Sequence, residues 1–377
     1  MAIDFLIVGG GIAGASAAYQ LAERGRTVVL EREDAPGYHS TGRSAALYTE
    51  TYGNAAIRAL TICSGPFFRD PPDGFAEHPL IAPRGAMIVA PPCAEARYRA
   101  ALAEGRRHAE SVHGVDVEEA LRLCPLLRRD WLGYAIHEPD AMDMDVHAIH
   151  QGFLRGLRAR GGEVVTSAEV HALARRGGVW EATTAAGRYE APIVIDAAGA
   201  WADEVARLAG VRPIGLVPKR RTAFIIDLPE GVDASRWPMV IDIDETLYFK
   251  PESGRLLVSP ADETPLPPCD VQPEELDIAE AAERLLERTG LEVRRVLRKW
   301  AGLRSFVADK TPVVGHAPDA PGFVWLAGQG GYGIQTSAAM GRVAAALATG
   351  DEMPADLVAR GLRASDLLPD RLHKPQV

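Results

Sequence analysis

A glycine-rich segment near the N-terminus has the residue types and spacing of a nucleotide-binding turn. Residues 9–14 read Gly-Gly-Gly-Ile-Ala-Gly and follow an apolar run at residues 3–8. In such a turn the first glycine permits a tight bend, the second lets a pyrophosphate approach the backbone, and the third allows close helix packing. Glu31 lies 20 residues beyond Gly11, where a carboxylate can accept hydrogen bonds from ribose hydroxyls. The sequence therefore predicts a dinucleotide site formed by Gly9, Gly11, Ile12, Ala13, Gly14, Glu31 and Arg32.

Two further segments bear on the choice between FAD and NAD, whose ADP halves are alike. Residues 37–46 are dense in small hydroxyl side chains and glycine, which suits donors along a phosphate and ribityl chain; the alternative is a surface loop. Residues 328–333 form a second glycine-rich stretch immediately before a helical pattern, and a helix dipole there would stabilise a reduced flavin. The prediction is non-covalent FAD, with contacts from Ser40, Thr41, Arg43, Ser44, Ala45, Ala46, Gly328, Gly330, Gly331, Tyr332, Gly333 and Ile334.

The elements that must position these residues alternate between strands and helices. A strand at residues 3–8, a helix at 15–24 and a strand at 27–30 predict a βαβ unit with parallel strands. A second unit combines a helix at 146–160, strands at 163–166 and 192–196, and a helix at 201–208. A last unit combines a strand at 323–327 with the alanine-rich helix after the glycines. We expect a Rossmann-type cofactor domain, in which Val170, Gly199 and Trp201 also contact the cofactor.

Between these units the pattern changes to alternating segments typical of antiparallel strands, at residues 87–90, 222–227, 246–250 and 256–259. The predicted fold class is α/β, with a Rossmann-type FAD-binding domain and a discontinuous α+β second domain built on a mixed or antiparallel sheet. Residues 1–83, 140–213 and 303–367 are assigned to the FAD-binding domain, and residues 84–139 and 214–302 to the substrate-binding domain. Residues 368–377 are predicted to be a loose tail.

Composition and charge argue against several classes of function. The formal net charge of -10, without a run of Lys and Arg, argues against nucleic-acid binding. No apolar run reaches the roughly 18 residues of a membrane span, so any contact with the inner membrane is expected to be peripheral and the chain cytoplasmic. The scattered cysteines Cys63, Cys93, Cys124 and Cys269 lack metal-ligand spacing and are read as reduced thiols.

One group of carboxylates and imidazoles has a spacing that could suggest a metal. It comprises Asp143, Asp145, His147 and His150. Asp143 or Asp145 is explained more simply as the N-cap of the helix that carries both histidines. No metal site is predicted.

Five segments resemble a known family of flavoenzymes: residues 37–46, 196–201 (DAAGAW), 218–221 (PKRR), 300–309 (WAGLRSFVAD) and 329–339 (QGGYGIQTSAA). Over nearly its whole length the chain resembles the FAD-dependent amino-acid oxidoreductases, which include D-amino acid dehydrogenases, glycine oxidase and sarcosine oxidase. Within them it most resembles the bacterial D-arginine dehydrogenases. The resemblance implies oxidative deamination of D-amino acids, in which a hydride passes from Cα to flavin N5 and the imino acid is hydrolysed to a 2-oxo acid and ammonia.

The resemblance also implies roles for particular residues. Arg304 and Tyr248 match ligands of the substrate carboxylate, for which a planar guanidinium is well suited. The carbonyl of Gly331 matches the acceptor of the substrate amine, Tyr52 a tyrosine on a mobile loop that covers the substrate, and Arg221 a second active-site arginine. From the residues alone, a structural ion pair for Arg304, a core position for Tyr52 and an acid partner for Arg221 remain alternatives.

Two departures from the resemblance bear on the choice of substrate. A glutamate facing a substrate guanidinium and a histidine beside the flavin are implied, and Ala86 and Leu47 stand at these positions. Because a buried cation without a carboxylate partner is costly, we expect neutral or apolar side chains to be preferred over arginine and lysine. The predicted specificity residues are Leu47, Ala86, Met239 and Ile241.

Several alternatives stay open at this point. Glu50, Asp242 or Asp244 could supply the missing carboxylate. A dehydrogenase would pass electrons to an artificial or quinone-type acceptor, whereas an oxidase of glycine, sarcosine or D-amino acids would pass them to O2. A flavin-carrying electron-transfer subunit and an NAD-linked dehydrogenase with the same turn are the rivals of other classes.

Overall fold

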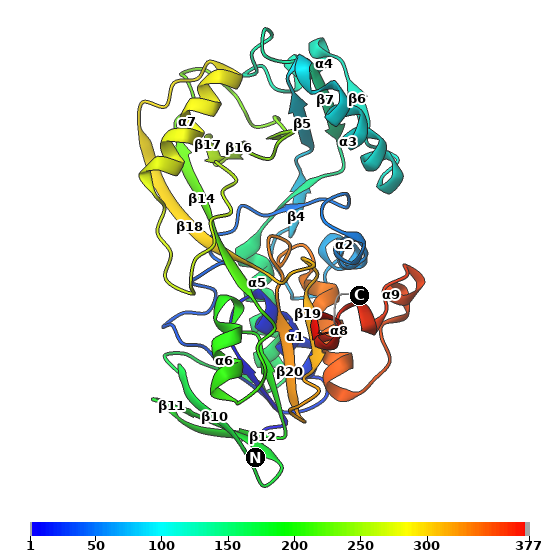
Figure 1. Cartoon of the computed structure of the whole chain (residues 1–377), viewed down its shortest axis with the longest axis vertical. Coiled ribbons are helices and arrows are strands. Elements are labelled where there is room, and N and C mark those ends of the chain that lie inside the picture. Colours follow the sequence, from blue (N-terminus) through cyan, green and yellow to red (C-terminus); the bar gives the residue numbers. More distant parts are fainter. Residues whose placement is uncertain (1, 374–377) are drawn as a thin grey trace.

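Two large sheets, one in each half of an elongated molecule, organise the structure, a computed structural model that describes residues 2–373 (Figure 1). A six-stranded sheet lies in the lower half of the view and an eight-stranded sheet in the upper half. The long strands β14 (Val217–Ile226) and β18 (Val296–Phe306) run from the upper half to the middle of the molecule.

The six-stranded sheet forms around the N-terminal unit. β1 (Phe5–Val8), α1 (Ile12–Leu21) and β2 (Thr27–Leu30) make the βαβ unit expected from the sequence, and β1 and β2 pair in parallel. The strands are parallel except for the edge strand β19. The carboxyl ends of the parallel strands therefore meet at one edge, where the glycine turn lies. The strand order is β19 (Val313–His316), β20 (Phe323–Ala327), β13 (Ile193–Asp196), β1, β2 and β9 (Glu163–Val165).

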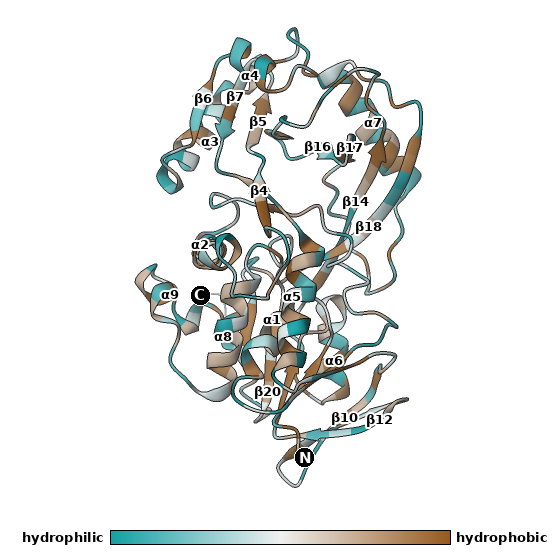
Figure 2. Cartoon of the chain, turned by 180° about the vertical axis from the view of Figure 1, so that it is seen from behind, coloured by the Kyte–Doolittle hydropathy of each residue, from teal (hydrophilic) through white to brown (hydrophobic). Residues whose placement is uncertain are grey.

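The strands of this sheet direct apolar side chains to both of its faces. Phe5 and Ile7 pack against α1, α5 (Val146–Ala159) and α8 (Ser337–Thr349). Leu6 and Val8 pack on the opposite side, against α6 (Ala202–Leu208) and the three-stranded sheet of β10 (Val170–Arg176), β11 (Val179–Thr184) and β12 (Gly187–Ala191). Because both faces are covered, the strands are almost wholly apolar, as the brown colour of β20 in Figure 2 illustrates.

The eight-stranded sheet is mixed, and it contains the four strands expected at residues 87–90, 222–227, 246–250 and 256–259. Only β15 and β5 pair in parallel among its named strands. α7 (Glu275–Thr289) and α4 (Val117–Leu123) pack on one face, and α3 (Glu95–His108) lies beside β6 and β7. The strand order is β18, β14, β17 (Arg255–Ser259), β16 (Tyr248–Glu252), β15 (Met239–Asp242), β5 (Ala86–Ala90), β7 (Tyr134–Glu138) and β6 (His113–Val115).

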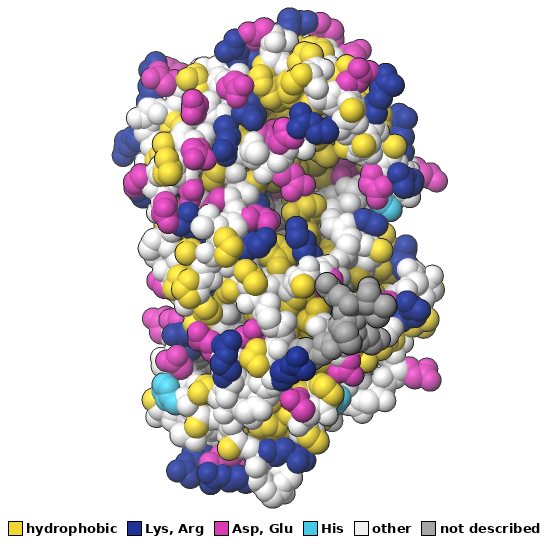
Figure 3. Space-filling view, in the orientation of Figure 1, with side chains coloured by type: hydrophobic (Ala, Val, Ile, Leu, Met, Phe, Trp, Pro, Cys, Tyr) yellow, Lys and Arg dark blue, Asp and Glu magenta, His cyan; other side chains and the backbone are white. Residues whose placement is uncertain are grey.

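The remaining elements are short or peripheral. β3 (Leu47–Tyr48), β8 (Met142–Met144) and β4 (Ile81–Pro83) form a small sheet, and α2 (Ala55–Arg69) packs with α8 and α9 (Ala355–Ala359). Short 3-10 helices occur at Pro92–Ala94, Gly199–Trp201, Ala364–Asp366 and Pro369–His373. No helix within residues 2–373 has the length and apolar character needed to cross a membrane. Figure 3 shows acidic and basic side chains interspersed over one face.

Two expectations need correction. α8 does not begin directly after the glycines, because residues 333–336 form an extra turn in which the N–H of Thr336 donates to the carbonyl of Tyr332 (3.1 Å). The tail is not loose from residue 368 onward: Pro369–His373 is helical, and Arg371 pairs with Asp309 (2.8 Å). Residues 374–377 of the predicted tail lie outside the described residues.

Candidate active site

A cavity of about 260 Å³ extends from the carboxyl ends of the parallel strands to β14, β16 and β18. It joins segments that are far apart in the sequence. Of the predicted cofactor contacts, Gly14, Ala46, Gly328 and Tyr332 are not part of its lining. Those that line it are Gly9, Gly11, Ile12, Ala13, Glu31, Arg32, Ser40, Thr41, Arg43, Ser44, Ala45, Val170, Gly199, Trp201, Gly330, Gly331, Gly333 and Ile334.

Two positions of the glycine turn admit only glycine. Gly9 has a φ of +106°, and a Cβ on it would lie 2.4 Å from the carbonyl oxygen of Ala197. A Cβ on Gly14 would lie 1.9 Å from the carbonyl oxygen of Gly9, so this glycine serves the packing of α1 rather than the cavity. Both contacts are with backbone atoms, which cannot move aside as a side chain can. The turn thereby fixes a strand-to-helix geometry that suits a pyrophosphate.

Glu31 is held in place by two backbone donors. Its side chain is buried, its Oε2 accepts from the N–H of Gly10 (2.8 Å), and its Oε1 accepts from the N–H of Glu33 (2.9 Å). Each carboxylate oxygen has a further lone pair, so the group can still accept hydrogen bonds from a ribose. Thr41 braces the other side of the turn by accepting from the N–H of Ile12 (3.0 Å).

Arg32 and Trp201 form one wall of the cavity. The guanidinium carbon of Arg32 lies 4.8 Å from the centre of the indole ring, and the ring of His39 lies 4.6 Å from the same indole. A cation–π contact of this kind fixes the orientation of the aromatic ring. Trp201 therefore presents a positioned aromatic surface where the sequence predicted a cofactor contact.

Arg43 lines the cavity, but its terminal nitrogens are used within the protein. NH1 donates to the carbonyls of Val271 and Ala301 (3.1 Å each), and NH2 donates to Asp270 (2.5 Å). The guanidinium of Arg43 therefore ties the 37–46 segment to β18 and to residues 270–271, and its predicted contact with the cofactor stays a prediction. Ser40 does likewise, since its hydroxyl donates to the carbonyl of Leu303 (2.6 Å).

Arg304 and Tyr248 lie at the other end of the cavity without polar partners. Arg304 rests against the backbone of Gly331, where an added Cβ would lie 2.9 Å from NH1. Within residues 2–373 its guanidinium makes no ion pair or hydrogen bond, and the hydroxyl of Tyr248, only 5% exposed, makes none either. Burial opposes the charge of Arg304, but interactions with the phenols of Tyr248, Tyr52 and Tyr332 raise its pKa, so it remains a cation. Arg304 is only partly buried and lines the cavity, so its unpaired charge is available to a bound anion.

Arg221 lines the same cavity and does have an acid partner. Its Nε donates to the carbonyl of Asp262 (2.9 Å) and its NH2 to Glu263 (3.2 Å). Burial lowers the pKa of Arg221, and the positive charge of Arg304 lowers it further. The two guanidinium groups are thus close enough to repel each other, which a bound carboxylate would relieve.

Tyr52 does not itself line the cavity; it lies in a small cluster close to Arg304. It packs with Ile57, Phe306 and Tyr332, and its ring centre lies 4.9 Å from that of Tyr332. Burial raises the pKa of Tyr332, and the neighbouring Tyr52 raises it further. Tyr332 does not line the cavity, and its ring packs edge-on against Phe306. Both phenols interact electrostatically with Arg304, so the cluster adjoins the unpaired guanidinium.

The predicted specificity residues gather beside Tyr248. Leu47, Met239 and Ile241 share one apolar cluster with it, although none of them lines the cavity. Ala86 pairs with Met239 across β5 and β15. These side chains come from three separate segments and present apolar groups next to the phenol of Tyr248.

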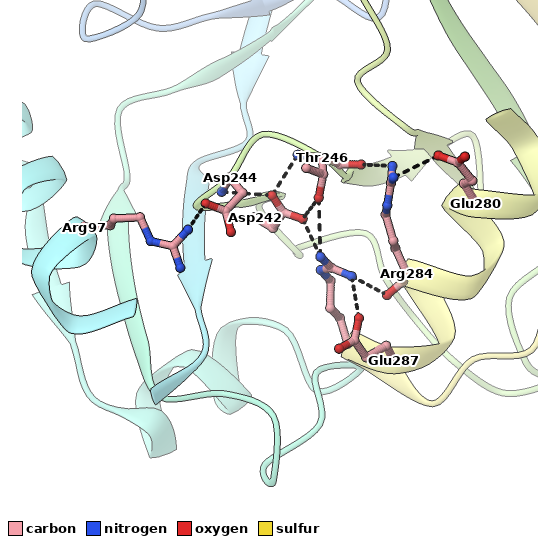
Figure 4. Close-up of polar contacts among 8 residues, drawn as sticks. Arg97, Asp242, Asp244, Thr246, Glu280, Arg284 and Glu287 are labelled. Atoms are coloured by element: carbon pink, nitrogen blue, oxygen red, sulfur yellow. Dashed lines mark hydrogen bonds and ion pairs between the residues drawn. The ribbon is translucent and has the colours of Figure 1, made fainter. Parts of the chain in front are cut away.

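The acids considered as substitutes for the missing glutamate already have partners. Asp242, at the end of β15, pairs with Arg288 of α7 (2.8 Å), and Asp244 pairs with Arg97 of α3 (Figure 4). Glu50 has an arginine partner in α2. Each of the three carboxylates is therefore neutralised within the protein.

The carboxylate and imidazole group around α5 has structural roles. Asp145 caps the helix by accepting a backbone N–H (2.8 Å), while Asp143 pairs with Arg84 (2.6 Å) and Lys250 (2.9 Å). His150 hydrogen-bonds to the carbonyl of Gly10 in the glycine turn (2.8 Å), and burial lowers its pKa. In the described part of the chain, no group of His, Cys, Asp and Glu could hold a metal ion.

Gln329 lines the cavity and lies in the glycine-rich stretch 328–333, but it was not among the predicted cofactor contacts. Its Nε2 is buried and has no hydrogen-bond partner among residues 2–373. Leaving a buried donor unpaired costs about 1–3 kcal/mol, so an acceptor on a bound molecule fits this position. The unpaired amide of Gln329, the glycine turn and the anchored Glu31 together give the cavity the hydrogen-bonding groups that FAD requires. Ala197, Ala198, Gly302 and Ser305 line the cavity within segments that carry the family resemblance, whereas Ala168, Glu169, Glu204 and Ala223 line it outside any such segment.

Comparisons with known proteins agree with this geometry. The sequence model of a family described as "FAD dependent oxidoreductase" (DAO) matches residues 4–347. Mitochondrial sarcosine dehydrogenase of Mus musculus is 24% identical over 363 residues, which is 90% of this chain but 39% of that protein. Glycine oxidase of Bacillus licheniformis is 24% identical over 382 residues, covering 94% of this chain and 95% of the oxidase. The crystal structure of L-proline dehydrogenase from P. horikoshii matches with a TM-score of 0.83 at 20% identity, over 99% and 98% of the two chains.

Proposed function

The chain belongs to the family of FAD-dependent oxidoreductases, and from this membership we propose that it oxidatively deaminates amino acids, preferring D-amino acids with neutral or apolar side chains. FAD, when bound, supplies the electron sink that takes a hydride from the substrate Cα. Water then hydrolyses the imino acid to a 2-oxo acid and ammonia.

The observation that carries the proposal is the unpaired Arg304 beside the unpaired hydroxyl of Tyr248. In the proposal both groups bind the substrate carboxylate, with Arg221 adding a second positive charge. The carbonyl of Gly331, which accepts no hydrogen bond from the described residues, takes one from the amine. Two fixed points on the substrate restrict it to rotation about one axis and so limit the directions in which its Cα–H can point. Solvent removes the amine proton, and no side chain is assigned as a base.

The residues of the glycine turn and Glu31 would hold the ADP half of FAD, and Gly330, Gly333 and Gln329 its flavin half. We also propose the division inferred from the sequence: residues 1–83, 140–213 and 303–367 for the cofactor, and 84–139 and 214–302 for the substrate, in a cytoplasmic enzyme. The electron acceptor is proposed to be of the quinone type, for which artificial dyes substitute.

The preference for neutral side chains is supported by the apolar cluster around Tyr248 and by the paired state of Asp242, Asp244 and Glu50. A substrate arginine would find no free carboxylate among them. The D configuration is carried over from the resemblance to D-amino acid dehydrogenases. The relatives named for glycine, sarcosine and L-proline make amino acids the common substrate class and make both enantiomers necessary in any test.

We expect the D-forms of methionine, leucine and phenylalanine to bleach the bound flavin anaerobically, with kcat/KM at least roughly tenfold above that for D-arginine. The assay is dye reduction with D- and L-amino acids, glycine and sarcosine. D-arginine as the best substrate, or L-forms as the better enantiomers, would contradict the corresponding part of the proposal. Failure of every amino acid to reduce the flavin would favour an electron-transfer subunit. Fast reoxidation in air with peroxide release would identify an oxidase.

Gly331→Ala is expected to weaken substrate binding while FAD stays bound. The φ of Gly331 is not in the left-handed region, so alanine fits the backbone, but its Cβ would press against NH1 of Arg304. Displacing the clamp by a fraction of an ångström should raise KM roughly 10- to 100-fold. Visible absorbance measures the flavin content and steady-state kinetics the KM. An unchanged KM would show that Arg304 does not need its observed position.

A further inference from the structure

The segment that carries Tyr52 connects β3 to α2. Leu47 and Tyr48 form β3, and Asn54 caps α2 by accepting from the N–H of Ile57 (3.1 Å). Between them Tyr52 makes no hydrogen bond within residues 2–373, so its own side chain does not fix its position through polar contacts. The position of Tyr52 must therefore depend on ring packing and on the residues next to it in the chain.

Glu138, the last residue of β7, binds the two threonines of this segment. The hydroxyl of Thr49 donates to Oε1 (2.7 Å) and the hydroxyl of Thr51 donates to Oε2 (2.6 Å). The two hydroxyl oxygens are 3.1 Å apart. Glu138 stands opposite Ala86 in the antiparallel pair of β5 and β7, so both side chains lie on one face of the sheet. The carboxylate thus faces the specificity region, with both oxygens engaged by Thr49 and Thr51.

Glu50, between the two threonines, and Gly53, after them, are bound by residues other than Glu138. Glu50 accepts from the hydroxyl of Tyr48 (2.6 Å) and from Arg69 of α2 (3.1 Å). Gly53 has a φ of +89°, and its carbonyl accepts from Arg58 (2.5 Å). The chain is therefore fixed immediately before Tyr52 by Glu138 and immediately after it by α2.

We propose that Glu138 is a positioning residue that, through Thr49 and Thr51, holds Tyr52 at the substrate end of the cavity. The proposal rests on the proposed function, because it assumes that Tyr52 covers an amino acid bound to Arg304. Burial raises the pKa of Glu138, and the hydrogen bonds from Thr51 and Thr49 reduce that rise because they stabilise the carboxylate form. Losing one bond frees the segment without removing any group that touches the substrate, so binding should suffer more than the rate of flavin reduction.

The test compares Thr51→Val, which keeps the shape of threonine and removes its hydroxyl, with Thr51→Ser, which keeps the hydroxyl. For D-leucine we expect Thr51→Val to raise KM roughly tenfold. The limiting rate of flavin reduction should change less than about twofold, because the reacting groups are intact. Thr51→Ser should restore the KM of the parent. Adding Glu138→Gln to Thr51→Val should have little further effect, because the bond to Thr51 is already lost and the amide oxygen of glutamine can still accept from the hydroxyl of Thr49.

Tyr52→Ala separates failure of this inference from failure of the proposed function. A raised KM in Tyr52→Ala together with an unchanged KM in Thr51→Val would overturn the role of Glu138 alone. A lowered unfolding temperature of Thr51→Val with unchanged KM would also overturn it, because the bond would then be merely structural. An unchanged KM in Tyr52→Ala would overturn the covering role of Tyr52 and this inference with it, whereas only failure of amino acids to reduce the flavin of the parent protein would overturn the proposed function.

Discussion

Replacing Arg304 by alanine is expected to raise the KM for amino acids by roughly 30- to 3,000-fold while FAD stays bound. Losing one partner of a buried, hydrogen-bonded charge pair costs about 2–5 kcal/mol, and each 1.4 kcal/mol is about a factor of ten. Arg304 has no partner of its own in the described chain, so its removal leaves no protein group unpaired. The stability of the protein should therefore be unchanged or improved. Steady-state kinetics measure KM, visible absorbance measures the flavin content, and thermal unfolding measures the stability.

Two further variants test whether the charge of Arg304, its planar guanidinium or simply an arginine in this strand is needed. Arg304→Lys keeps the charge but loses the planar fork, so its KM should lie between those of the parent and of Arg304→Ala. Arg298→Ala removes an exposed arginine from the same strand and should leave KM unchanged. A parent-like KM in Arg304→Ala, or an equal rise in Arg298→Ala, would contradict the carboxylate clamp.

Local patterns in the sequence were sufficient to predict the cofactor half of the site. Strands that are buried on both faces can be recognised from a short apolar run alone, without knowledge of residues far away in the sequence. This is how the βαβ unit was predicted, including Thr27–Leu30, and likewise the strand Phe323–Ala327. The glycine spacing implied a turn, and the backbone contacts of Gly9 and Gly14 give the physical reason for it.

Long-range partners could not be predicted in the same way. No local pattern indicates that Arg43 pairs with Asp270, a residue 227 positions away. Likewise Glu138 meets Thr51 only because β7 pairs with β5 and the 49–53 segment contacts the end of β7. The predicted start of α8 was wrong because hydrogen bonds within residues 332–336 determine where the helix begins. The glycine content of the segment does not reveal these hydrogen bonds.

Asp196 is a buried carboxyl group at the carboxyl end of β13. It is 0% exposed; its Oδ1 accepts from the N–H of Ala198 (3.2 Å), and its Oδ2 has no partner in the described chain. Burial raises the pKa of Asp196 well above its usual value, and the nearby Asp203 raises it further. In acid the carboxyl is protonated in both the folded and the unfolded chain. As the pH rises past about 3.9 the unfolded chain releases this proton first, so the stability contributed by Asp196 is lost as the pH rises through its folded pKa.

Asp196→Asn is therefore expected to stabilise the holoenzyme increasingly from pH 5 to pH 8, because asparagine cannot ionise. At pH 8 we expect a gain of about 1–3 kcal/mol, the usual cost of a buried polar group without its partner, and little difference near pH 4. Urea unfolding of both proteins at several pH values measures it. Asp203→Asn is the matched control: Asp203 accepts the N–H groups of Ile214 (3.0 Å) and Leu216 (2.9 Å), and an amide can replace only one of these oxygens. That control should lose stability at neutral pH, whereas a pH-independent or negative effect of Asp196→Asn would mean that Asp196 is ionised in the folded protein.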